Sequence, residues 1–204
     1  MSDKGNMDTL DILEEKVLGC TDCPLAETRT IAVPGEGSIA SGAMFVGEAP
    51  GFHEDQQGRP FVGPAGKFLD QLLNLAGLNR EDVYITNVVK CRPPSNRDPF
   101  PSEIQACQKY LDRQIELLQP RVIISLGRHS LSHFLPKELI SKCHGQPRER
   151  NGLTVYPMYH PAAALHQQAL RSVIETDMKR LPEILSEAHT NPEKGTEEQQ
   201  LNMF

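Results

Sequence analysis

Apolar residues along the chain follow two spacings that predict strands and helices in alternation. Short runs of strand length occupy 44–46, 83–89, 122–126 and 153–158. Stretches with helical spacing occupy 8–18, 64–76, 101–118, 128–135 and 170–186. Strands that alternate with helices are typical of a parallel sheet covered on both faces. We therefore predict an α/β fold, a three-layer α/β/α sandwich with a central, mainly parallel four-stranded sheet.

Polar side chains collect where the predicted strands end. The strand-end loops begin after Val46, Val89, Gly127 and Met158. In a parallel sheet these loops share one edge, where ligands usually bind. Glu48, Asn87 and His160 lie at or just beyond strand ends, and Phe61 stands in a Gly- and Pro-rich loop. Each has an ordinary structural explanation by itself, but together they indicate a binding site.

Length and charge fit a single globular domain with a polar end. The chain has 204 residues, of which 38% are hydrophobic, and a net charge of −6. That charge comes from residues 1–16 and 187–204, so the rest of the chain is neutral overall. No apolar run has membrane-spanning length and the start is acidic rather than signal-like. We expect a cytoplasmic, monomeric protein with one domain over 1–186 and an acidic tail over 187–204.

Two short segments concentrate positive charge. Residues 87–97 carry Lys90, Arg92 and Arg97 without an acidic residue, and residues 142–150 carry three bases against one acid. Local basic patches, rather than the global charge, attract phosphate. Nucleic acid is therefore the first candidate partner, and solvated loop charges are the alternative.

Four cysteines form two groups with metal-ligand spacing. They are Cys20, Cys23, Cys91 and Cys107. Thiols of a cytosolic chain stay reduced, so the pattern favours a metal centre over disulfides. Spacing alone slightly favours a structural zinc site over an iron–sulfur cluster. Cys143 remains as a spare thiol.

Several long motifs carry a resemblance to a known family. They read GEAPG at 47–51, ED at 54–55, GRPFVGPAG at 58–66, YITNVVKCRPP at 84–94 and HPA at 160–162. In this order they resemble the motifs of family 4 uracil-DNA glycosylases, the iron–sulfur branch of that superfamily. The resemblance runs from about Cys20 to Leu181, which is most of the chain.

The resemblance implies a base-excision repair enzyme that flips uracil out of single- or double-stranded DNA and hydrolyses its N-glycosidic bond, leaving an abasic site. Phe61 would stack on the base, Asn87 would pair with its edge, and His160 would stabilise the charge on uracil O2. Backbone groups of Gly47 to Ala49 would assist. Because Ala49 stands where related families have an aspartate, either Glu48 or backbone carbonyl groups would position the water, and we favour Glu48 as the only carboxylate within the motif. Glu54 would exclude the thymine methyl.

The same resemblance implies that the four grouped cysteines hold a [4Fe–4S] cluster rather than zinc. The cluster would order the loop between Cys91 and Cys107 so that Arg92, Asn96 and Arg97 meet DNA phosphates. Leu165 would fill the space left by the flipped base, or else it is a buried leucine at a helix start.

Two other functional classes compete with a monofunctional glycosylase. A non-catalytic iron–sulfur uracil-DNA-binding or polymerase accessory protein explains the cluster and basic loop. It leaves Glu48, Asn87 and His160 without a role. An electron carrier explains only the cysteines.

The last residues form a separate prediction. Residues 187–200 have the composition of a disordered tether. The chain then ends with Gln200, Leu201, Met203 and Phe204, which resemble a short motif that docks on the replication sliding clamp. Terminal hydrophobic residues without a role are the alternative.

Overall fold

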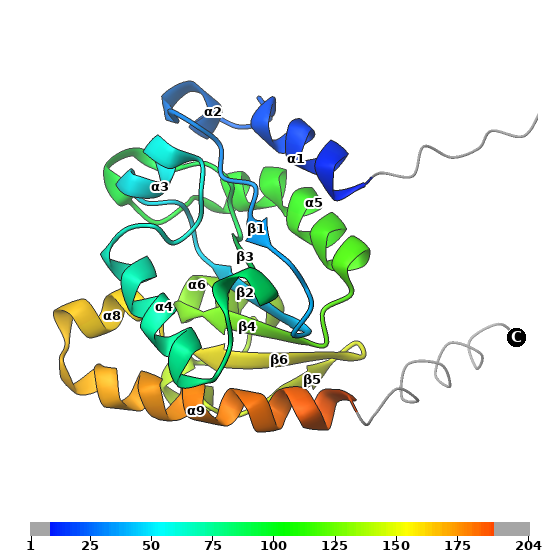
Figure 1. Cartoon of the computed structure of the whole chain (residues 1–204). Coiled ribbons are helices and arrows are strands. Elements are labelled where there is room, and N and C mark those ends of the chain that lie inside the picture. The colour runs from blue at the N-terminus through cyan, green and yellow to red at the C-terminus, as the bar shows by residue number, and fades with distance from the viewer. Residues whose placement is uncertain (1–8, 190–204) are drawn as a thin grey trace, which may run out of the picture.

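The computed structural model describes residues 9–189 and contains a six-stranded sheet (Figure 1). The strand order is β1-β3-β2-β4-β6-β5. The strands are β1 (Glu36–Gly37), β2 (Ala43–Gly47), β3 (Tyr84–Asn87), β4 (Val122–Leu126), β5 (Arg148–Arg150) and β6 (Leu153–Met158). The predicted α/β fold is confirmed.

The four predicted strands form the parallel centre of the sheet. Strand β2 pairs in parallel with β3 on one side and β4 on the other, and β4 pairs in parallel with β6. Two antiparallel edge strands, β1 and β5, were not predicted, so the four-strand count is wrong. They are two and three residues long, too short for any periodicity to appear in the sequence.

Alternate residues of the strands build two separate cores. In β2, Phe45 packs in one apolar cluster, whereas Met44 and Val46 pack in the other. This division follows from the two-residue period of a strand that is buried on both faces. The sheet therefore needs helices on both sides.

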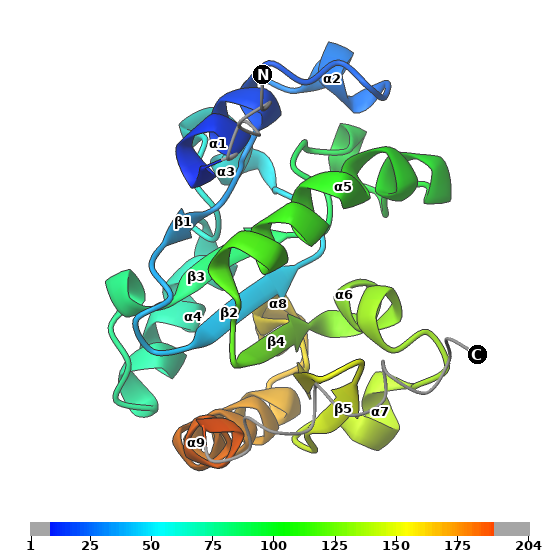
Figure 2. The same ribbon diagram turned by 90° about the vertical axis from the view of Figure 1, so that its right-hand side faces the viewer.

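Helices cover both faces of the sheet, as Figure 2 shows for α5 and α9. One face is covered by α4 (Pro64–Leu75), α8 (Pro161–His166) and α9 (Ala169–His189). The other is covered by α1 (Leu10–Leu18), α5 (Pro101–Leu118) and α6 (Gly127–Phe134). No helix within residues 9–189 is long and apolar enough to cross a membrane.

Short helices that the sequence did not reveal lie in the connections. They are α2 (Leu25–Thr28), α3 (Phe52–Gln57), α7 (Ile140–Cys143), and the 3-10 turns η1 (Arg80–Asp82) and η2 (Pro94–Asn96). Helix α9 continues to His189, three residues beyond the predicted helix end at residue 186. The rest of the predicted tail, including the predicted clamp motif, lies outside the described residues.

Candidate active site

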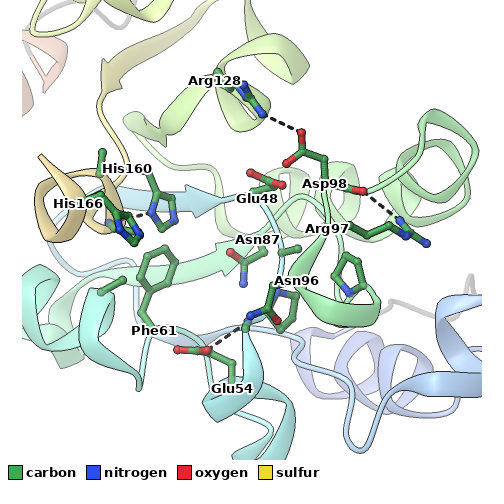
Figure 3. A pocket seen from close by; sticks show the side chains of 17 residues that line it. Glu48, Glu54, Phe61, Asn87, Asn96, Arg97, Asp98, Arg128, His160 and His166 are labelled. Carbon is green, nitrogen blue, oxygen red and sulfur yellow. Dashed lines mark hydrogen bonds and ion pairs between the residues drawn. The ribbon is translucent and has the colours of Figure 1, made fainter.

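A pocket of about 680 Å³ opens at the carboxyl edge of the parallel strands (Figure 3). The loops after β2, β3, β4 and β6 all contribute to its lining. The predicted site residues among that lining are Glu48, Ala49, Glu54, Phe61, Asn87, Asn96, Arg97 and His160. Strand order explains this convergence, since the chain crosses from one side of β2 to the other between β3 and β4.

Asn87 is the last residue of β3, and its side chain points into the middle of the pocket. It is only 2% exposed. Gly47, its register partner on β2, makes room for it. A Cβ at Gly47 would lie 2.3 Å from Asn87 Oδ1 and 2.8 Å from Phe61 Cζ. Gly47 therefore lies against the predicted base-reading residues and is needed for their approach.

Phe61 is held by an unusual backbone and by Glu54. Its φ of 51° is left-handed, and its carbonyl oxygen lies 1.8 Å from where a Cβ at Gly66 would stand. Glu54 Oε1 accepts hydrogen bonds from the N–H groups of Val62 and Gly63, both at 2.9 Å. Its second oxygen accepts from Gly51 N–H at 3.1 Å. The Glu54 carboxylate thus fixes the loop that carries Phe61, besides lining the pocket.

His160 enters the pocket beside Phe61, with the two rings stacked at 5.5 Å between centroids. Its Nδ1 accepts a hydrogen bond of 3.1 Å from Ala162 N–H at the start of α8. Burial lowers the pKa of His160 to about 4, although the Glu54 charge acts against this shift. At neutral pH the ring is therefore uncharged. Because Nδ1 is an acceptor, the proton resides on Nε2, which is a donor.

Glu48 follows β2 and is partly buried in the same pocket. Burial raises the pKa of Glu48, the charge of His129 lowers it, and Asp98 raises it further. The Glu48 Oε2 lies 3.8 Å from His129 Nε2. The carboxyl group of Glu48 is therefore partly buried in the pocket, where its charged form is less well solvated than in water.

Sequence reasoning missed an ionic group at the pocket rim. Asp98 Oδ2 lies 2.8 Å from Arg128 Nη2 and 3.1 Å from His129 Nε2. This group joins the loop after Cys91 to the beginning of α6. Arg128 lies just after the end of β4, at the carboxyl edge of the sheet. This position in the sequence could have predicted that Arg128 lines the pocket.

The predicted DNA-contacting residues take different roles. Arg92 Nε donates to Asn96 Oδ1 at 2.7 Å beside the pocket. Arg97 forms two hydrogen bonds, of 2.7 and 2.9 Å, with the buried carboxylate of Glu103. Leu165 is 51% exposed near the end of α8, so the alternative of a buried leucine is wrong. Phosphate contact by these residues stays a prediction.

The four grouped cysteines line a second, small pocket together with Arg29 and Lys90. Arg29 Nη1 donates to Cys91 Sγ at 3.1 Å, and Lys90 N–H donates to Cys107 Sγ at 3.3 Å. Burial raises the pKa of the Cys107 thiol to about 11, whereas the Lys90 charge lowers it. Cys143 is fully buried in α7 and does not line this pocket.

The prediction that Lys90 belongs to a basic surface patch is wrong. Lys90 is 1% exposed and therefore contributes no charge to a phosphate-binding surface. Arg92 and Arg97 are partly exposed, so the positive surface of this loop is smaller than its composition indicates.

Comparison with known proteins agrees with the motifs. Residues 34–180 match the Uracil DNA glycosylase superfamily. The chain is 50% identical over 190 residues to a Type-4 uracil-DNA glycosylase of Saccharolobus solfataricus, which covers 88% of each chain. It is 48% identical to the protein of the same name from Sulfurisphaera tokodaii over 87% of this chain and 86% of that one. The Thermotoga maritima protein of that name is 46% identical over 84% of this chain and 92% of its own length.

Proposed function

Because this chain belongs to the uracil-DNA glycosylase superfamily and is a uracil-DNA glycosylase of the Type-4 kind, we propose that the pocket beyond β2 and β3 binds a flipped uracil and hydrolyses its bond to deoxyribose. The observation that supports this most is the meeting of Asn87, Phe61 and His160, which lie far apart in the sequence, in one pocket. The base must leave the duplex, because the bond is out of reach in a stacked pair.

Asn87 reads the base edge in this proposal. Its amide offers one donor and one acceptor, which match uracil O4 and N3–H. Cytosine presents the opposite order at these two atoms, so a fixed amide discriminates against it. Phe61 supplies the stacking surface, and the carboxylate of Glu54 lines the pocket where a thymine methyl group would be excluded.

His160 stabilises the leaving base. Breaking the N-glycosidic bond leaves negative charge that spreads onto uracil O2, and a donor placed there lowers the barrier. A neutral ring with its proton on Nε2 performs this role without first losing a proton.

We expect His160→Ala to slow single-turnover excision on the order of 10²–10³-fold, the usual effect of removing one donor to a developing oxyanion. Rapid-quench assays with a uracil oligonucleotide measure this step. Affinity for the same oligonucleotide serves as the control and should change little. A single-turnover rate close to that of the unchanged protein would place the stabilisation elsewhere.

Glu48 positions the attacking water, and its ionised form is a much stronger hydrogen-bond acceptor for that water than its protonated form. Because burial raises the pKa of Glu48, the single-turnover rate should fall as the pH drops through a value above the ordinary 4.5. His160 stays neutral throughout this range, since its pKa is near 4. Glu48→Gln should lower the plateau rate on the order of 10²-fold and remove this acid limb. An acid limb that persists in Glu48→Gln would assign it to another group.

The four grouped cysteines are proposed to hold a [4Fe–4S] cluster. Cys20, Cys23, Cys91 and Cys107 line one pocket, so the fold brings four thiol donors from two distant segments together. Four thiolates suit a structural zinc ion as well as an iron–sulfur cluster, and the resemblance to the iron–sulfur branch of the superfamily favours the cluster.

When bound, the cluster supplies a structural cross-link between the first helices and the loop that carries Arg92. The donors from Arg29 and Lys90 suit thiolate ligands. Iron analysis and visible absorbance of protein purified without oxygen test this proposal. Stoichiometric zinc without iron in that preparation would overturn it.

DNA contact is proposed for the rim of the pocket. Arg92, Asn96 and Arg97 lie in the loop that the cluster would order, and Leu165 is exposed on α8 in a position suited to a wedge. Arg97 is partly neutralised by Glu103, so its share of the phosphate attraction is smaller than that of Arg92.

The activity itself is tested with an oligonucleotide that bears one uracil. Incubation followed by alkali cuts the strand at that position if a glycosylase has left an abasic site. Intact DNA that the protein retains tightly would favour a non-catalytic uracil-DNA-binding or polymerase accessory protein.

We also propose that the domain ends within or after α9 and that the terminal segment docks on a sliding clamp. Leu201, Met203 and Phe204 would fill an apolar pocket, and Gln200 would add a polar contact. Deleting residues 200–204 should remove clamp binding and leave excision on short oligonucleotides unchanged. Titration of a labelled 190–204 peptide with the clamp measures the contact. No saturation up to high micromolar clamp would exclude it.

A further inference from the structure

Lys90 has an environment that the proposed chemistry does not explain. Its ammonium group is buried between β3 and α5, 1% exposed. Nζ lies 2.6 Å from Thr86 Oγ1, 2.8 Å from the Asn87 carbonyl oxygen and 2.6 Å from Gln114 Oε1. The side chain thus turns back toward the strand end that carries the base-reading residue.

The three partners of Lys90 Nζ are all placed to accept a hydrogen bond. Thr86 Oγ1 donates its own proton to Pro34 O at 2.7 Å, so it accepts from Nζ. Gln114 donates through Nε2 to Pro34 O and to the Tyr84 hydroxyl, so its Oε1 also accepts. The third partner is a carbonyl oxygen. Three acceptors match the three N–H bonds of an ammonium group.

None of these partners is a carboxylate, although a buried charge normally requires a counter-charge. Lys90 also lines the cysteine pocket, precedes Cys91 and donates its backbone N–H to Cys107 Sγ. The negatively charged groups that this position can serve are therefore the thiolates of the cysteine pocket.

We propose that Lys90 is the buried counter-charge of the cluster and the positioning residue that fixes the backbone of Asn87. This inference rests on the proposed cluster. Four thiolates carry more negative charge than the iron–sulfur core offsets, so the ligand set attracts a cation. The same side chain donates to the carbonyl oxygen of Asn87, three residues earlier in the chain. In this proposal, loss of the cluster would therefore change the position of Asn87 in the pocket.

The test compares Lys90→Met with Tyr84→Phe. Lys90→Met removes the charge and keeps an unbranched side chain. Tyr84→Phe disturbs the same buried network by removing the Gln114 Nε2 acceptor, but it keeps the cation. Both are purified without oxygen, and iron content, cluster reduction potential and single-turnover excision are measured.

Reduction adds negative charge to the cluster, which a nearby cation stabilises. Lys90→Met should therefore move the reduction potential to a more negative value. It should also slow excision on the order of 10²-fold by misplacing Asn87. Tyr84→Phe should leave the potential unchanged. An iron-loaded Lys90→Met protein with an unchanged potential overturns the proposal, and so does an equal shift in Tyr84→Phe.

If Lys90→Met does not fold or retain iron, Lys90→Arg decides the outcome. A cationic replacement should recover iron content if charge is what the site requires. Failure of Lys90→Arg as well means that the site requires the shape of lysine, which contradicts the proposal. Absence of iron from the unchanged protein would instead refute the cluster itself, so the two failures are distinguishable.

Discussion

Replacing Asn87 with alanine should lower single-turnover uracil excision on the order of 10⁴-fold, the scale on which a site with paired buried polar groups discriminates. Asn87 is buried, and its amide points to the centre of the pocket. Without it, uracil would leave its O4 and N3–H groups unpaired in a poorly solvated place. Iron content and visible absorbance should stay unchanged, because the side chain of Asn87 does not line the cysteine pocket.

Asn96→Ala is the matched control. Asn96 lines the same pocket, but it is exposed and its Oδ1 accepts from Arg92. We expect a decrease of less than tenfold in excision, with weaker DNA binding, as for a lost contact at a solvated rim. Equal losses in the two variants would show that general damage to the pocket, rather than reading of the base, explains the effect of Asn87→Ala.

Replacing Cys91 with alanine should remove both the cluster and much of the stability. Cys91 is buried, directly follows Lys90 and accepts a hydrogen bond from Arg29. Losing one of four ligands costs roughly 3 kcal/mol or more, because metal binding contributes directly to folding. For a chain of this size, that lowers the melting temperature by about 10 °C.

Cys143→Ala provides the control for this variant. Cys143 is also buried, but it lies in α7 and not in the cysteine pocket. Iron analysis, thermal unfolding and excision should all remain close to those of the unchanged protein. A stable, iron-free and fully active Cys91→Ala protein would contradict a structural role for the cluster.

Long apolar periodicities made the main elements readable from the sequence. The helix predicted at 101–118 and the strand predicted at 122–126 have the observed bounds. Their amphipathic or fully apolar patterns extend over five to eighteen residues, so local signals decide them. Edge strands β1 and β5 form because a neighbouring strand offers unpaired backbone groups, and a pattern of two or three residues cannot reveal this.

Part of the candidate site could also be predicted from the sequence, but for a different reason. Glu48, Asn87 and His160 stand at strand ends, and parallel strands bring their carboxyl ends together. Their meeting in one pocket thus follows from topology. Arg128 and Asp98 complete the rim through an ion pair between segments 30 positions apart, which no motif encodes.

By itself, the sequence determined the α/β class, the four parallel strands, the family motifs and the residues from which pocket and cysteine centre are built. These follow from periodicity and from residue types at fixed spacing. Only the tertiary structure decided which of these side chains are exposed, which are already hydrogen-bonded and which nitrogen of His160 carries its proton. Lys90 looked like a surface charge and is buried, Arg97 is bound to Glu103, and the Ala162 N–H places the proton of His160 on Nε2. Burial and hydrogen-bond partners set charge and protonation, and both depend on residues that are distant in the chain.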